Sequence, residues 1–296
     1  MDTPGLRHHG EVNASAPAVG QVSQGEQATK PIWLWSWAIS ALVTLASVLG
    51  LTDPGTYDEE TANWAAQARG QDIGNLVAVV TLLVSGHRWA RGSHRAAMVW
   101  LGTLLYLVYA YTVYSLAVHF NQLFLVYVAA MGLSVYAVLL SVDRLRADSR
   151  RLPPPPARMV AGCTSIAIGG LFGVLWLSEL IPATVSGEVP QSVVEAGLWV
   201  NPIHVIDLAI LLPALIIAGW QTLQGRATGR FFVGPLLVFS VLMGTSIVAA
   251  MVLMTTEGVE DTSAPLIMVS LTVLASLFAA WRHLGRFEPA QAPPHG

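Results

Sequence analysis

The chain carries little charge: only 11% of its 296 residues are Asp, Glu, Lys or Arg, whereas a soluble domain usually has about a quarter. Hydrophobic residues make up 54%. This composition excludes a soluble globular protein and a disordered chain. It indicates an all-α, polytopic integral membrane protein, for which the lipid bilayer is the first partner.

Cysteine and lysine are nearly absent as well. Cys163 is the single cysteine, so it cannot form an internal disulfide or supply a cysteine-based metal cluster. Lys30 is the only lysine among 15 basic residues, and the resulting arginine bias indicates a GC-rich bacterial genome. The net charge of -3 excludes a chain-wide nucleic-acid binder.

The sequence lacks the short motifs of common enzyme classes. It contains no Walker motif, dinucleotide-binding glycine pattern, nucleophile elbow, HExxH or cysteine pair. A b-type haem in a membrane needs histidines on facing helices, but only His119 and His204 lie near apolar stretches, both toward the same side. We therefore predict no cofactor and no metal, and leave open whether the protein is an enzyme.

Eight apolar stretches are long enough to cross a bilayer, because about 20 helical residues span a hydrocarbon core of about 30 Å. Once in lipid, each must be helical to satisfy its backbone polar groups. The predicted spans cover residues 32–51, 73–90, 96–118, 122–142, 158–182, 203–223, 231–254 and 264–284.

The loops between these spans alternate in charge. One set is basic and contains Arg88, Arg91, Arg95, Arg144, Arg146, Arg150, Arg151, Arg158, Arg226, Arg230, Arg282 and Arg286. The other is acidic and contains Asp53, Asp58, Glu59, Glu60, Glu188, Glu195, Glu257, Glu260 and Asp261. The positive-inside rule places the basic set in the cytoplasm. Eight spans then leave both termini cytoplasmic, in a multi-pass protein of the plasma (inner) membrane.

The two halves of the chain resemble each other at an offset of 135 residues. The matched rare residues are Trp64 and Trp199, Asp72 and Asp207, Arg91 and Arg226, and Arg95 and Arg230. This pattern indicates a tandem duplication of four-helix units, parallel because four spans are an even number. The predicted organisation is a disordered cytoplasmic tail (1–31), a first repeat (32–151), a Pro-rich linker with the start of span five (152–166), a second repeat (167–286) and a cytoplasmic tail (287–296).

Each predicted repeat has a segment at the outer side of the membrane. Residues 58–69 contain good helix formers and precede Gly70, a typical helix stop, and residues 191–199 follow a proline. Both segments are predicted to be short helices at the interface, anchored by Trp64 and Trp199. The alternative is a simple ordered loop.

Acidic residues inside a membrane are costly and by default indicate function. Asp72, Glu179 and Asp207 lie near the outer ends of predicted spans. Asp207 shares a helix face with His204 at i,i+3 spacing, which allows the pair to hydrogen-bond. The alternatives are a helix N-cap for Asp72, an interfacial hydrogen bond for His204 and Asp207, and snorkelling for Glu179.

Four tyrosines mark the third span. Tyr106 and Tyr109 share a helix face, whereas Tyr111 and Tyr114 approach the outer boundary, where an aromatic belt is expected. At 100° per residue the four spread over about 200° of the helix. This spread favours interface packing over a ligand-lining role.

Two further patterns concern helix packing. Ser165, Gly169 and Gly173 form a row of small residues in span five, which predicts a close helix contact. Pro213 in span six is predicted to kink that helix at mid-depth.

Together the polar residues predict an outward-facing cavity lined by Asp72, Glu179, His204 and Asp207, with Arg69 at its rim. Arg69 has a simpler interpretation as half of a surface ion pair. The favoured function is transport or binding of a small solute or a lipid-like molecule. The alternatives are a membrane-embedded enzyme acting on a lipid or isoprenoid, and an accessory subunit with a membrane-protein partner.

Overall fold

The computed structural model describes the backbone of residues 21–148 and 155–285 and the side chains of 32–147 and 158–285. Every regular element within these ranges is a helix. The elements are α1 (Gln21–Thr52), η1 (Pro54–Tyr57), α2 (Ala62–Ala90), α3 (His94–Ala117), α4 (Phe124–Asp148), α5 (Pro155–Ser186), α6 (Gln191–Glu195), α7 (Pro202–Ile206), η2 (Asp207–Leu211), α8 (Leu212–Leu223), α9 (Ala227–Thr256) and α10 (Ser263–Leu284).

Eight helical segments in the described residues are long and apolar enough to cross a membrane, as the sequence predicted. They are consistent with a multi-pass membrane protein. Each lies at a predicted place, and the sixth is built from α7, η2 and α8. The helix α1 begins at Gln21, inside the segment expected to be a tail. The predicted linker residues 152–154 and the terminal segment 287–296 lie outside the described residues.

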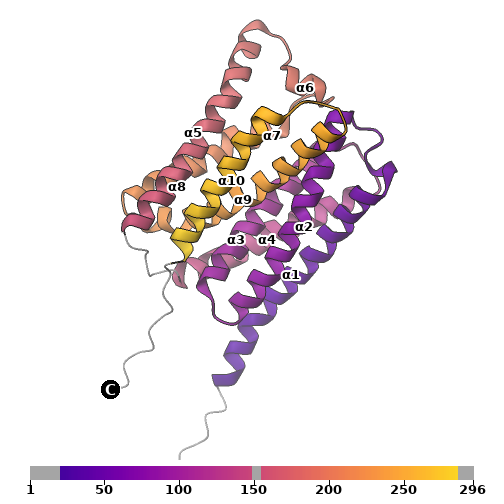
Figure 1. The fold of residues 1–296 in the computed structure, drawn as a ribbon. Coiled ribbons are helices and arrows are strands. Elements are labelled where there is room, and N and C mark those ends of the chain that lie inside the picture. Colours follow the sequence, from indigo (N-terminus) through magenta and orange to yellow (C-terminus); the bar gives the residue numbers. More distant parts are fainter. Residues whose placement is uncertain (1–20, 149–154, 286–296) are drawn as a thin grey trace, which may run out of the picture.

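The helices form one bundle in which the two halves repeat the same neighbour relations (Figure 1). In the first half α1 packs against α2 and α4, and α3 packs against the same two helices. In the second half α5 packs against α8 and α10, and α9 packs against the same two helices. The halves meet mainly where α9 packs against α2 and α3.

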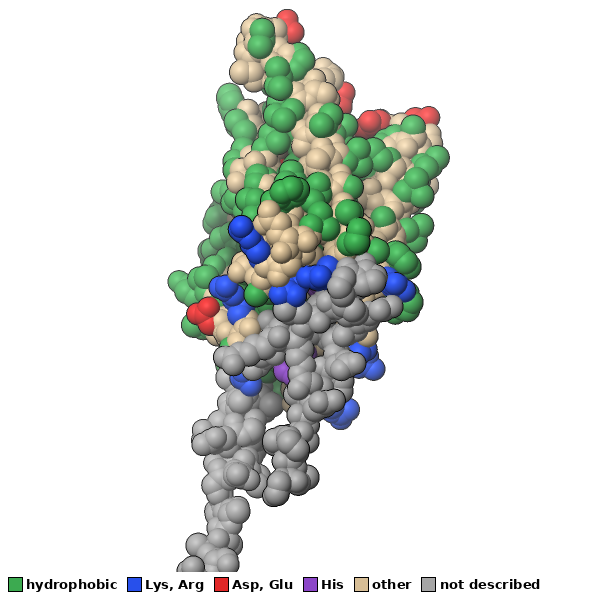
Figure 2. Space-filling view, turned by 90° about the vertical axis from the view of Figure 1, so that its left-hand side faces the viewer, with side chains coloured by type: hydrophobic (Ala, Val, Ile, Leu, Met, Phe, Trp, Pro, Cys, Tyr) green, Lys and Arg blue, Asp and Glu red, His purple; other side chains and the backbone are tan. Residues whose placement is uncertain are grey.

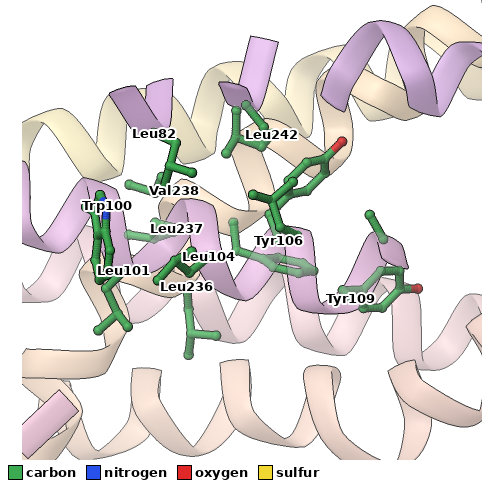
Figure 3. Close-up of a cluster of buried hydrophobic side chains, with 14 of the residues drawn as sticks. Leu82, Trp100, Leu101, Leu104, Tyr106, Tyr109, Leu236, Leu237, Val238 and Leu242 are labelled. Carbon is green, nitrogen blue, oxygen red and sulfur yellow. The ribbon is translucent and has the colours of Figure 1, made fainter. Parts of the chain in front are cut away.

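The third span, α3, is the most buried of the eight. Trp100 and Leu104 on α3 are fully buried, and they share the central apolar cluster with Leu82 of α2 and Leu237 of α9 (Figure 3). Because α3 has neighbours on all sides, tyrosines spread around its circumference all face protein. The predicted placement of Tyr111 and Tyr114 at the lipid interface is therefore wrong.

Charged side chains separate between the two ends of the bundle. Figure 2 shows blue arginines toward one end of the described surface and most red carboxylates at the opposite end. We call these the arginine end, formed by Arg88, Arg91, Arg95, Arg144, Arg146, Arg158, Arg226, Arg230 and Arg282, and the acidic end. The acidic end is formed by Asp53, Asp58, Glu59, Glu60, Glu188, Glu195, Glu257, Glu260 and Asp261.

The predicted interface helix at residues 58–69 is wrong, because α2 runs without interruption from Ala62 through Gly70. Thr61 caps this helix by accepting a hydrogen bond from the backbone N–H of Trp64. Gly70 does not end the helix; a Cβ at this position would collide with the backbone of Ala250 on α9. The glycine therefore allows two helices to approach closely.

The two tryptophans expected to be interface anchors differ in how far their side chains are exposed. Trp64 is only 4% exposed, and its indole N–H donates to the carbonyl of Ala117 at 2.7 Å. Trp199 is 99% exposed and follows the short helix α6, which occupies part of the predicted segment 191–199. Only the second of the two segments matches the expectation of a separate short helix.

The small-residue row of α5 packs against α8 over part of its length. Ser165 donates to the carbonyl of Leu215 at 2.7 Å, and a Cβ on Gly169 would press on Ile216. A Cβ on Gly173 would meet nothing within 4 Å. The predicted close contact is thus confirmed at Ser165 and Gly169.

Candidate functional site

A cavity of about 310 Å³ lies between the two halves, toward the acidic end. The helices α2, α3, α5, α8, α9 and α10 contribute to its walls. Most lining side chains are apolar, among them Val113, Ile168, Phe172, Leu212, Phe239, Met243, Ile247, Met251 and Met254. The polar ones are Gln67, Gln71, Tyr109, Tyr114, Trp176, Asp207, Ser240, Ser246, Glu260, Thr262 and Thr272.

Asp207 is the carboxylate that the apolar helices contribute to this wall, and it is 7% exposed. Tyr109 of α3 donates its hydroxyl to Oδ1 at 2.9 Å, and the indole N–H of Trp176 on α5 donates to Oδ2 at 2.8 Å. Two donors from different helices therefore hold this carboxyl group in a fixed position.

The backbone around Asp207 is also unusual. Asn201 caps the helix by accepting from the N–H of Ile203, and Pro202 occupies its first turn, where a missing N–H costs nothing. Asp207 then begins the π-helical turn η2, which ends two residues before Pro213. Single π-turns inside helices are frequent at functional sites. Proline has no N–H to donate to the preceding turn. Pro213 thus interrupts the regular α-helical pattern beside the carboxylate.

His204 contacts Trp176 instead of sharing a hydrogen bond with Asp207. Its ring stacks at 4.7 Å between centroids, tilted by 55°. The side chain is buried, and within the described residues its Nε2 has no hydrogen-bond partner. It lines a second hollow of about 730 Å³, whose wall includes the exposed Trp199. The predicted pair is thus joined only indirectly, through the indole of Trp176.

Asp72 is enclosed by protein, with an exposed fraction of 0%, and it lies inside α2. It is therefore not a helix N-cap. The hydroxyl of Tyr57 donates to Oδ2 at 2.6 Å, and that of Tyr114 donates to Oδ1 at 2.9 Å. Burial first, and then the Asp72 carboxylate, raise the pKa of Tyr57, so this phenol keeps its proton. Tyr114 also lines the cavity and so separates it from Asp72.

A second polar chain runs from the cavity into the contact between α2 and α9. Gln71 donates to the hydroxyl of Tyr106 at 2.6 Å, and that hydroxyl donates to Oδ1 of Asn75 at 2.9 Å. The Tyr106 hydroxyl also lies 2.7 Å from the hydroxyl of Ser246. Gln71 and Ser246 both line the cavity. Buried hydroxyl and amide groups therefore connect the cavity wall to the helix that carries Asp72.

Glu179 and Arg69 lie away from the cavity wall. Glu179 accepts a hydrogen bond from the backbone N–H of Ser192 at 3.2 Å, which joins α5 to α6. Arg69 forms an ion pair with Glu257 at 2.6 Å, with both side chains about one-third exposed (34% and 33%). The simpler interpretation of Arg69, a surface ion pair, matches this geometry.

The five residues predicted to share one cavity thus occupy several places. Asp207 lines the main cavity, His204 lines the second hollow, and Asp72 reaches the main cavity only through Tyr114. The sequence analysis missed Trp176, although an indole within a span and far from its ends is a signal of a polar partner in the protein interior.

No protein-family model matches the chain, and no match is found among curated proteins or solved structures. In the described residues no three His, Cys, Asp or Glu side chains are grouped so that they would hold a metal ion. An apolar cavity with a fixed carboxylate in its wall is suited to binding a molecule that is mostly apolar and carries one hydrogen-bond donor.

Proposed function

We propose that this protein binds a small, lipid-like amphipathic molecule in the cavity between its two halves, as a transporter or carrier. The observation that carries the proposal is the apolar cavity of about 310 Å³ with Asp207 in its wall. Sites for small molecules typically occupy about 300–1,000 Å³ and combine apolar walls with a few fixed polar groups. A single acyl or isoprenoid-sized molecule matches this size and lining.

Asp207 is the group proposed to hold the polar end of that molecule. Each oxygen accepts one hydrogen bond from the protein, and an ionised carboxylate has about four acceptor positions. A hydroxyl or amine of the ligand can therefore take an unused position. Gln67 and Gln71 in the same wall offer further polar contacts.

We also propose that the arginine end faces the cytoplasm of a bacterial inner membrane, with both termini on that side. The separation of arginines from carboxylates supports this orientation through the positive-inside rule. The cavity, which lies toward the acidic end, would then receive its ligand from the outer leaflet or the external side.

The tandem duplication remains our proposal for the origin of the two halves. The shared neighbour pattern of the helices supports it. So does the position of Asp72 and Asp207, because each lies on the second span of its half and accepts a hydrogen bond from a tyrosine of α3. Parallel repeats around a central site are a common plan for transporters.

One observation favours an accessory-subunit role as a second candidate. Trp199 is 99% exposed, and its neighbour Val200 is 65% exposed, beside the second hollow. Exposed aromatic residues of this kind are enriched where proteins bind each other. A membrane-protein partner bound at this surface would copurify with the protein. The main cavity would then play no part in the function.

The experiment compares lipids that copurify with matched tryptophan variants of α9. Met243→Trp places a large ring in the cavity, whereas Val252→Trp places the same ring at a position that is 44% exposed. Lipids extracted from each protein, purified in mild detergent, are identified by mass spectrometry. We expect a species that is retained by the wild type and by Val252→Trp and lost from Met243→Trp. Identical extracts from both variants would contradict the proposal.

A further inference from the structure

Asp72 is a carboxyl group inside the bundle whose charge, when it is ionised, is not compensated by the proposed ligand site. It is fully enclosed, and its nearest basic side chain along the helix, Arg69, is paired with Glu257. An ionised carboxylate in a membrane interior costs a few kcal/mol unless a cation or water compensates for it. Binding a proton removes this cost.

The groups that face Asp72 come from each helix packed around it, and the titratable ones are tyrosines. Helix α1 contributes the hydroxyl of Ser47, and η1 contributes Tyr57. The remaining tyrosines near the carboxylate are Tyr106, Tyr111 and Tyr114 of α3 and Tyr127 of α4, and α9 contributes Ser246 to the hydrogen bonds of Tyr106. Asn75 follows on the same helix. In the described residues the surroundings of Asp72 thus consist of hydroxyl and amide groups.

The space around the carboxylate fits a proton and is too small for a hydrated ion. A Cβ on Gly50 of α1 would collide with Oδ2 of Asp72 and would lie 2.6 Å from the hydroxyl of Tyr57. The Asp72 carboxyl and the Tyr57 hydroxyl therefore already fill the space that a side chain at position 50 would occupy. A metal cation with even one water molecule would need the helices to separate.

The hydrogen bonds of Tyr114 suit both protonation states of Asp72. Its hydroxyl lies 2.9 Å from Oδ1 of Asp72 and also 2.9 Å from the carbonyl oxygen of Ala68. When Asp72 is ionised, the hydroxyl donates to Oδ1. When Asp72 carries a proton on Oδ1, that proton is donated to the tyrosine oxygen, and the hydroxyl donates to Ala68 instead. Rotation of the Tyr114 hydroxyl about its C–O bond therefore keeps the tyrosine and the Asp72 carboxyl hydrogen-bonded in both states.

We propose that Asp72 is a proton-binding site inside the membrane and that it exchanges protons with the cavity through Tyr114. Tyr114 is the link because it is hydrogen-bonded to Asp72 and also lines the cavity. The inference goes beyond ligand binding and does not depend on which molecule the cavity holds.

The proton transfer balances in one concerted step. A hydronium ion in the cavity gives a proton to the Tyr114 oxygen and becomes water. The tyrosine releases its own hydroxyl proton to Oδ1 of Asp72, which becomes a neutral carboxyl. One O–H bond forms and one breaks at the tyrosine, so this side chain is unchanged, and no oxidant or reductant is involved.

The first test is infrared difference spectroscopy on the purified full chain in lipid nanodiscs, with acid and alkaline buffers exchanged over the sample. The expected spectrum contains the C=O stretching band of a protonated carboxyl at acid pH. The part of this band contributed by Asp72 should be missing from the spectrum of Asp72→Asn and present in that of Asp207→Asn, whereas the contributions of the other carboxyl groups remain in both. Persistence of the whole band in a folded Asp72→Asn variant would overturn the assignment.

The second test measures how quickly that band responds to a pH jump. Tyr114→Phe keeps the ring that stacks on Tyr111 at 5.5 Å but removes the relay hydroxyl. We expect slowing on the order of 100-fold, the lower end of what a positioned proton-transfer group contributes. Tyr111→Phe is the matched control, because the hydroxyl of Tyr111 is buried without a hydrogen-bond partner in the described residues, and it should respond as fast as the wild type.

Tyr57→Phe distinguishes the two sides from which protons can arrive. Tyr57 is the other donor to Asp72 and lies between α1 and α2 at the acidic end. If exchange proceeds through the cavity, the pH midpoint shifts in this variant but the response stays fast. A slow response in Tyr57→Phe with a fast one in Tyr114→Phe would overturn the route. Because these spectra need no added ligand, their failure is distinguishable from failure of the proposed lipid binding.

Discussion

Asp72 and Asp207 lie 135 residues apart, each on the second span of its half, yet their hydrogen-bond donors come from different parts of the molecule. Asp72 accepts hydrogen bonds from Tyr57 and Tyr114, both within its own half. Asp207 takes the corresponding bond from Tyr109, which belongs to the other half. The residue 135 positions after Tyr114 is Ala249, which has no hydroxyl to offer. The acid of the first half, Asp72, is therefore enclosed by protein, whereas the acid of the second half, Asp207, is part of a cavity wall.

The helices around the two acids explain this difference. In the first half α2 continues past Trp64 and closes the bundle against α3. In the second half the chain is not helical at the corresponding place: Gly197, 135 residues after the start of α2, lies in a turn with a φ of 69°, and helix α7 begins only at Pro202. The interruption leaves Trp199 exposed and the neighbouring space open. In the proposed repeat, one sequence element would thus have acquired two roles, because the helix is continuous in one half and interrupted in the other.

The largest expected effect comes from the two matched tryptophans. Trp64→Ala removes a buried ring and leaves the Ala117 carbonyl without its donor, so we expect a loss of about 3–5 kcal/mol in the free energy of unfolding. Trp199→Ala should change this free energy by less than about 0.5 kcal/mol. Unfolding of the purified proteins in detergent, followed by circular dichroism, measures both. Equal losses would show that the halves are packed alike.

A smaller effect is expected when the first half is given the residue of the second. The residue 135 positions after Gly70 is Val205, which is 54% exposed. Gly70→Val places a branched side chain against the backbone of Ala250 and should destabilise the protein by about 1–3 kcal/mol. The reverse change, Val205→Gly, should cost less than about 1 kcal/mol, because only helix propensity is lost. The same unfolding assay applies, and a neutral Gly70→Val would refute the close contact of α2 with α9.

An effect of similar size is expected for the tyrosine donors of the two acids. Tyr114→Phe removes a donor from an enclosed carboxyl and should lower the free energy of unfolding by about 1–3 kcal/mol. Tyr109→Phe should cost less than about 1 kcal/mol, because water in the cavity can replace the lost donor of Asp207. Thermal melting of both variants, each against the wild type, measures the difference. A larger loss for Tyr109→Phe would reverse the assignment of closed and open acids.

The spans were predictable because composition and length decide them locally. The start of α2 was not, since Asn63 and Gln67 give the helix a polar first part that a hydropathy pattern excludes from the membrane. Gly70 was misinterpreted for a related reason. A glycine signals either a helix end or a close helix contact, and only the position of Ala250 on a distant helix decides between them.

The candidate site was only partly predictable. Asp72, His204 and Asp207 were identified because buried polar groups are rare in apolar spans. Their separation into an enclosed acid, a cavity wall and a second hollow depends on how the second and sixth spans are rotated against their neighbours, which no local pattern encodes. Tyr109 and Tyr114 were noticed but assigned to the lipid interface or to an undecided face, because the sequence does not reveal that α3 is surrounded.

The π-helical turn at Asp207–Leu211 has a consequence for the phase of the two halves. In both halves the acid precedes an arginine, Arg91 or Arg226, by the same number of residues. A π-turn uses one residue more than an α-turn, so the second-half segment is about 1.5 Å shorter along its axis than its counterpart in α2. The segment up to Asp207, where the turn begins, is also rotated by about 100° relative to the part that follows the turn. In the proposed repeat, this phase shift directs the acid across the boundary between the halves.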